Sequence, residues 1–165
     1  MRISTLATLA VLIVPAALTA QEDSLVDYQS LTPEVALELA EATLEYCRDE
    51  GYQVGVSVVD RSGVQQVFLR DRFAGPHVVE TAFRKAWTAI SFRTDTLALD
   101  ETTRAGEVSA GIRDLSLALP LGGGVPVEVA GSTVAGIGVS GAPGPDLDDA
   151  CARAGIEAIA DRLPL

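Results

Sequence analysis

The chain has 165 residues, of which 48% are hydrophobic, and a formal net charge of −11 at pH 7. This length suits one domain with one core, and the apolar content argues against a disordered chain. An acidic chain whose only lysine is Lys85 is also a poor candidate for binding nucleic acid, because phosphate contacts need clustered Lys and Arg.

The N-terminus has the pattern of a secretory signal peptide. Arg2 supplies a positive start, Leu6 to Leu18 is apolar apart from one threonine, and Ala20 ends the segment with a small residue. We therefore expect residues 1–20 to be removed by cleavage before Gln21. The apolar run is short for a membrane span, and no later run is longer, so the mature protein is expected to be soluble, and periplasmic or secreted.

Residues 21–30 are expected to form a flexible leader, followed by a single domain over residues 31–165. Thr32 suits an N-cap and Pro33 the first position of a helix, which Gly51 then ends.

A valine-rich alternating pattern predicts strands over residues 54–60 and 64–70, joined by a turn into a hairpin. Pro76 favours the start of a helix that extends to Phe92, and residues 94–113 are polar enough for short helices joined by loops.

The second half predicts a further hairpin of strands 125–129 and 133–140. Residues 115–120 suit either a short strand or an extended run, and residues 147–163 a final helix. Hairpins imply an antiparallel sheet, here of about five strands, and terminal helices on one face would give an α/β, profilin-like three-layer sandwich.

His77 is the only histidine, and its position favours metal binding. With Pro76 at the first position of the helix, His77 would lie in the first turn, where the positive end of the helix dipole favours a neutral imidazole. Arg84 and Lys85 follow two turns later. A neutral imidazole with cations along the same helix suits a flat, anionic metal cofactor such as haem.

Haem in the mature chain would be bound non-covalently, as a b-type haem. The only methionine, Met1, is lost with the signal peptide, so ligation by His and Met together is excluded. The sequence also lacks the Cys-x-x-Cys-His motif that attaches haem covalently. Its two cysteines, Cys47 and Cys151, could form a disulfide in an oxidising compartment or remain separate buried thiols.

Two glycine clusters have competing interpretations. Residues 136–141 match the pattern G-x-G-x-x-G, but these glycines lie inside a predicted strand and two prolines follow, so packing within the sheet accounts for them better than a dinucleotide site. Ser140 in this cluster lacks the strand-to-helix turn of a hydrolase nucleophile. Gly123 and Gly124 could either admit a flat ligand close to the backbone or make a tight connection into the next strand.

Taken together and in order, five motifs resemble the GlcG/HbpS family, which is related to the C-terminal domain of PduO-type corrinoid adenosyltransferases. The motifs are Asp60-Arg61-Ser62-Gly63, Ala74-Gly75-Pro76-His77, Arg84-Lys85-Ala86-Trp87-Thr88-Ala89, Gly123-Gly124-Val125-Pro126 and Gly136-Ile137-Gly138-Val139-Ser140-Gly141. The resemblance runs from about Leu31 to Ala160. It implies a profilin-like domain that assembles into homo-oligomers. The family includes exported members that bind haem, some of which serve in haem and redox sensing.

The favoured hypothesis is an exported haem-binding protein that senses, stores or binds haem. The residues assigned to the cofactor are His77 as axial ligand, Arg84 and Lys85 toward the propionates, Phe73 in the apolar wall, and Gly123 and Gly124 at close approach. One alternative is an enzyme acting on a small organic acid or carbonyl compound, with His77 as acid or base and Arg84 as anion clamp. Another is a corrinoid-binding protein.

Overall fold

A computed structural model describes residues 25–164 of the chain. The predicted signal peptide, residues 1–20, and residues 21–24 of the predicted leader lie outside the described residues. Residues 25–30 are exposed and have no regular secondary structure. Ser30 ends this leader beside the sheet, where its hydroxyl donates to the carbonyl of Val134 at 3.3 Å.

The first helix begins and ends close to where the sequence predicts. Helix α1 covers Pro33–Asp49, and the hydroxyl of Thr32 accepts the backbone N–H of Val35 at 3.4 Å. Gly51 follows with φ +85°, a conformation that glycine adopts without a Cβ penalty.

Within residues 25–164, four strands form one antiparallel sheet. Strands β1 (Gly55–Asp60) and β2 (Gln65–Arg70) make the first hairpin, and β3 (Gly124–Val129) and β4 (Ser132–Ser140) make the second. The strand order is β2-β1-β4-β3, so β1 and β4 are the central strands and pair directly. Almost every residue of these two strands is buried, as expected for strands covered on both faces.

The expected fifth strand is absent from the described residues, because residues 115–120 form a turn and an extended run. Side chains of helix α2 (Val78–Phe92) bond the backbone of this segment. Arg84 donates to the carbonyls of Leu117 and Ala118 at 3.4 and 2.9 Å, and the hydroxyl of Thr88 accepts the N–H of Leu119 at 2.8 Å. The segment therefore needs no partner strand.

Helix α2 covers Val78–Phe92 and begins two residues later than predicted, with His77 at the N-cap. Residues 94–113 contain short helical segments, as expected. The final helix α4 covers Pro145–Ala158 and is shorter than predicted. The remaining helical segments are α3 (Thr96–Thr102) and the 3-10 helices η1 (Ala110–Asp114) and η2 (Ala160–Arg162).

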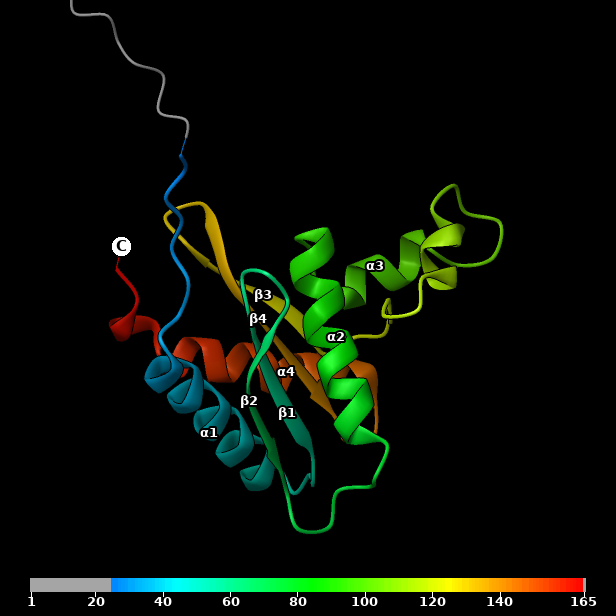
Figure 1. Ribbon diagram of the computed structural model, residues 1–165. Helices are drawn as coiled ribbons and strands as arrows, with labels where there is room; N and C mark the ends of the chain where they lie inside the picture. The colour runs from blue at the N-terminus through cyan, green and yellow to red at the C-terminus, as the bar shows by residue number, and fades with distance from the viewer. Residues whose placement is uncertain (1–24, 165) are drawn as a thin grey trace, which may run out of the picture.

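The helices complete a three-layer sandwich, which confirms the predicted fold class. Helices α1 and α4 pack side by side on one face of the sheet, and α2 covers the other face (Figure 1). Cys47 and Cys151 join α1 to α4 through a disulfide with a Cα–Cα distance of 5.6 Å. The second of the two sequence-based alternatives, separate thiols, is therefore wrong. No helix within residues 25–164 has the length and apolar character to cross a membrane.

Helix α2 lies unusually close to β4 because two glycines face it. A Cβ at Gly138 would overlap the carbonyl oxygen of Ala82, and one at Gly136 would come within 2.8 Å of the carbonyl oxygen of Ala86. These are two of the three glycines of the G-x-G-x-x-G match, and they pack against a helix instead of only within the sheet. The close approach fixes the height of α2 above the sheet and so positions the side chains along that helix.

Candidate functional site

The first turns of α2, the end of β4 and the start of α4 meet around a hollow of about 400 Å³. The connection from β4 to α4, residues 141–144, forms its rim together with Pro145, the first residue of α4. Polar side chains from both helices and the strand line it together with an apolar residue of the segment before β3. The lining side chains that matter for chemistry are His77, Thr81, Lys85, Leu121, Ser140 and Asp148.

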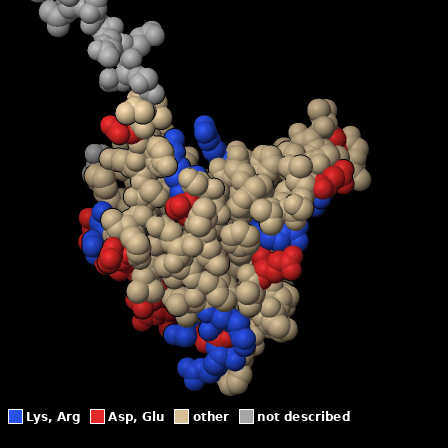
Figure 2. Space-filling model, viewed as in Figure 1, with Lys and Arg blue, Asp and Glu red and all other residues tan. Residues whose placement is uncertain are grey.

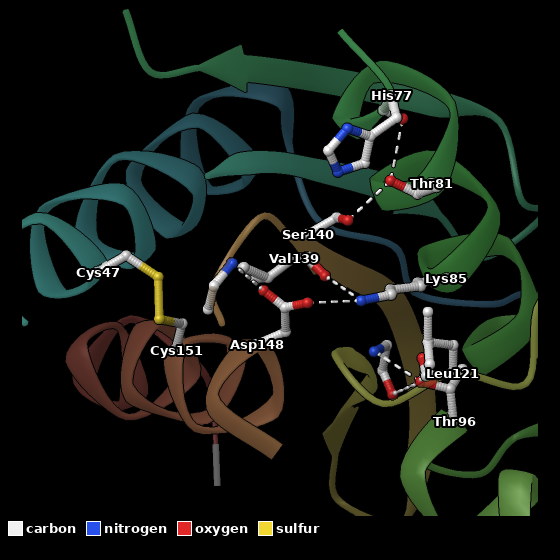
Figure 3. A network of polar contacts seen from close by, with 12 residues as sticks. Cys47, His77, Thr81, Lys85, Thr96, Leu121, Val139, Ser140, Asp148 and Cys151 are labelled. Carbon is white, nitrogen blue, oxygen red and sulfur yellow. Dashed lines mark hydrogen bonds and ion pairs between the residues drawn. A yellow bond between two sulfur atoms is a disulfide. The ribbon is translucent and has the colours of Figure 1, made fainter. Parts of the chain in front are cut away.

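His77 lies at the exposed edge of this hollow (Figure 3). Its imidazole makes no hydrogen bond to any group in residues 25–164. A Cβ at Gly75 would lie 2.7 Å from two atoms of the ring, so the bare backbone of that glycine makes room for the imidazole. The ring is therefore available to an external ligand.

Two hydroxyl groups connect the start of α2 to the end of β4. The hydroxyl of Thr81 lies 3.0 Å from the backbone carbonyl of His77 and 2.7 Å from the hydroxyl of Ser140 (Figure 3). A hydroxyl has one proton to donate. When Thr81 donates to Ser140, the proton of Ser140 is free to bond a ligand oxygen in the hollow.

The deepest feature of the hollow is a buried ion pair between α2 and α4. The ammonium of Lys85 lies 2.7 Å from Oδ2 of Asp148 and 2.9 Å from the carbonyl oxygen of Val139 (Figure 3). The side chains of Lys85 and Asp148 are only 1% and 6% exposed. The other carboxylate oxygen, Oδ1, accepts the N–H of Ala142 at 2.9 Å, so the pair also fixes the rim.

Burial brings the pKa values of Lys85 and Asp148 closer together. It lowers the pKa of Lys85, although the charge of Asp148 opposes this effect. It raises the pKa of Asp148, again against the charge of its partner and the hydrogen bonds that the carboxylate accepts. Proton transfer from the ammonium to the carboxylate consequently costs less here than it would between the same groups in water.

The two predicted cations on α2 have different environments. Arg84 donates to Glu80 at 3.1 Å and to two carbonyls of the segment that follows η1, so it holds that segment against the helix. Lys85 is buried and paired with Asp148. Phe73 lies in the loop between β2 and α2, with 80% of its surface exposed.

Gly123 and Gly124 lie beneath α2 and against the buried pair. Gly123 has φ +113°, and a Cβ there would come within 2.7 Å of Cβ of Asp148. A Cβ at Gly124 would overlap the backbone carbonyl of Lys85. Both glycines thus let the chain enter β3 under the helix, which fits the tight connection considered from the sequence.

The loop between β2 and α2 also carries a basic group. Asp71 is buried and accepts two hydrogen bonds from Arg48, at 2.7 and 3.2 Å, while Arg72 lies 3.9 Å away with its side chain 73% exposed. Figure 2 shows blue side chains gathered at this end of the molecule, although the chain as a whole is acidic. Arg48 of α1 and Arg72 of the loop therefore lie around the buried Asp71, at the start of the loop that leads to His77.

The sequence did not reveal the roles of Thr81, Ser140 and Asp148. An acidic residue in the first turn of a helix commonly interacts with the helix dipole, and nothing in that local pattern indicates that Asp148 pairs with Lys85, 63 residues earlier. The presence of a single lysine in an acidic chain is the one signal that could have indicated an unusual site.

These features define a small α/β sandwich domain with a polar hollow at the start of helix α2. The family model described as "Haem degrading protein HbpS-like" matches residues 31–157. The chain therefore belongs to the HbpS-like family.

Structural comparison agrees with this assignment. A double mutant of HbpS from Streptomyces reticuli is 39% identical, with 89% of this chain and 99% of that chain covered and a TM-score of 0.78. The PduOC:heme complex is 28% identical, with 79% and 95% covered and a TM-score of 0.73. Klebsiella pneumoniae protein ORFY, at 24% identity, 84% and 96% coverage and a TM-score of 0.80, shares the fold. No curated protein matches the chain.

Proposed function

We propose that this protein binds haem non-covalently and that His77 is the axial ligand of the iron. The observation that carries the proposal is an exposed imidazole, free of protein hydrogen bonds within the described residues, in a chain of the HbpS-like family. A 28% identical relative is known as a heme complex, which supports the same class of ligand. When bound, haem would supply the metal and the redox chemistry.

The surroundings of His77 suit a flat anionic ligand. Phe73 offers an exposed aromatic ring on the same loop, and Arg72 beside it offers a guanidinium for a propionate. Arg72 is five residues from His77, so the two Cα atoms lie within about 18 Å even if the chain between them is fully extended. Arg84 remains partly exposed and is a second candidate for a propionate. Lys85 is buried and forms an ion pair with Asp148, so it is a poorer candidate.

Haem titration of the purified mature protein tests this proposal. The wild type should give a Soret band that saturates at a fixed ratio of haem to chain, and His77→Ala should weaken binding and shift the band. Val79→Ala is a matched control, because Val79 is an exposed neighbour on the same helix turn. An unchanged band and affinity in His77→Ala would remove His77 from the site. Competition by cobalamin distinguishes corrinoid binding from haem binding.

We propose that the protein is exported to the periplasm or secreted, with residues 1–20 removed. The disulfide between Cys47 and Cys151 supports an oxidising compartment, since such bonds are rare in the cytosol. N-terminal sequencing of the protein recovered outside the cytoplasm should begin at Gln21. Recovery of the full chain from the cytoplasm only would contradict the proposal.

We also propose that the protein is a homo-oligomer. The segment from α3 to the start of β3 projects from the sandwich and exposes several large apolar side chains (Figure 1). They are Leu97, Val108, Leu115, Leu117 and Leu121. Because the chains carry like charge, assembly should strengthen as salt screens their repulsion. Light scattering that reports the mass of one chain at every salt concentration would reject assembly.

A further inference from the structure

The chain contains lysine at one position only, residue 85. Of its 12 Lys and Arg residues, 11 are arginines, and Lys85 is the single lysine. Arginine stays protonated in proteins, whereas a buried lysine can lose its proton and act as a nucleophile. The one basic side chain of this kind is thus placed in the hollow, against an acid that can take its proton.

Within residues 25–164, one N–H donor of the Lys85 ammonium makes no hydrogen bond. Two of its three N–H donors are directed to Asp148 and to the carbonyl of Val139. The third has no acceptor among residues 25–164, and Lys85 lines the hollow. Lys85 and Ser140 line the hollow together, so a small molecule there would lie beside the side chain that carries this free donor.

We propose that Lys85 condenses with a small aldehyde or ketone in this hollow to form an imine, with Asp148 as the acceptor and donor of the proton. The inference goes beyond haem binding, and it rests on Lys85 and Asp148 instead of the imidazole of His77. Burial supports it separately, because it lowers the pKa of Lys85 and raises that of Asp148.

The reaction balances without any further reactant. The ammonium gives one proton to the carboxylate of Asp148, 2.7 Å away. The neutral amine attacks the carbonyl carbon, an N–C bond forms, and the electron pair of the C=O bond moves to oxygen. The second nitrogen proton and the proton held by Asp148 leave with that oxygen as water, and a protonated imine remains. Its charge equals that of the original ammonium, so the ion pair with Asp148 is preserved.

The size and the lining residues of the hollow indicate which class of carbonyl compound it would bind. A volume of about 400 Å³ lies near the small end of the range for ligand pockets. Leu121, Ala142 and Pro143 supply apolar walls, and the hydroxyl of Ser140 can donate to the carbonyl oxygen while it accepts from Thr81. A short aldehyde or a small 2-oxo acid meets these conditions.

Reductive trapping tests the proposal on the intact oxidised protein, without haem. Acetaldehyde and pyruvate are added separately with sodium cyanoborohydride, and peptide mass mapping locates the reduced adduct. Because the chain has one lysine, an adduct on a lysine-containing peptide identifies Lys85. Trapping with pyruvate alone would support a 2-oxo acid site, and trapping with acetaldehyde would support a site that needs no carboxylate. No adduct with either probe overturns the proposal.

Two variants separate a built site from ordinary amine chemistry. Arg104→Lys introduces an amine at a side chain that is 64% exposed, and Lys85 in the same chain should be modified at least about tenfold faster than that amine. Asp148→Asn should slow trapping by about tenfold or more. Ser140→Ala provides a second variant if the first fails to fold, and it should also slow trapping. Equal rates at both amines, or modification of the introduced amine only, would overturn the proposal, whereas a failed haem titration would leave it intact.

Discussion

Removal of the disulfide between Cys47 and Cys151 should destabilise the protein substantially. The two cysteines are 104 residues apart, so the bond closes most of the folded chain into one loop. Under the chain-entropy model, a loop of this length restricts the unfolded chain by about 4.7 kcal/mol at 25 °C. This is a large part of the stability of a typical domain, which is about 5–15 kcal/mol.

Urea unfolding of the wild type and of the double variant Cys47→Ala with Cys151→Ala measures this effect. We expect a loss of about 4 kcal/mol and a lower midpoint. Wild-type protein unfolded in the presence of a thiol reductant should match the double variant, which controls for the change of side chain. A difference below about 1 kcal/mol in both comparisons would show that the unfolded chain is already restricted without the bond and would refute the loop-entropy reasoning.

Three further predictions concern the fold and its pH dependence. The hydrogen bond from Arg48 lowers the pKa of Asp71, so its stabilising effect is present above the unfolded pKa of about 3.9 and is lost as pH falls through the folded value. Asp71→Asn should therefore flatten the loss of stability below about pH 4, as measured by urea unfolding at several pH values; an unchanged slope would contradict this. Gly138→Ala should cost about 1–3 kcal/mol by forcing α2 off the sheet, while Gly111→Ala, which has open space, is the control with little effect in thermal unfolding. Thr32→Ala should cost about 1 kcal/mol through loss of the helix cap, and an equal midpoint in wild type and variant would refute that role.

The fold was predictable where local chemistry determines it. Thr32 and Pro33 mark the start of α1, and the valine-rich alternation marks the hairpin of β1 and β2, because caps and strand periodicity act within a few residues. The sequence left residues 115–120 open between a short strand and an extended run, since the groups that bond its backbone come from Arg84 and Thr88, about 30 residues earlier.

The candidate site was less predictable for the same reason. Pro76 correctly indicated that His77 lies near the start of a helix, but the burial of Lys85 depends on the height of α2 above the sheet. That height follows from Gly136 and Gly138, which are distant in sequence and were expected only to pack within the sheet. A buried ion pair formed across three elements has no local sequence pattern.

The contact of α2 with the two glycines of β4 also determines which parts of the molecule can adapt to a ligand. Because helix backbone rests directly on strand backbone there, neither element can shift toward the other, and no intervening side chains are available to change rotamer. Adjustment must occur in the segments that enter and leave this rigid unit, residues 71–77 and 141–144. These two loops hold Phe73 and His77 on one side and the rim of the hollow on the other, so selectivity can change through loop substitutions while the sandwich stays the same.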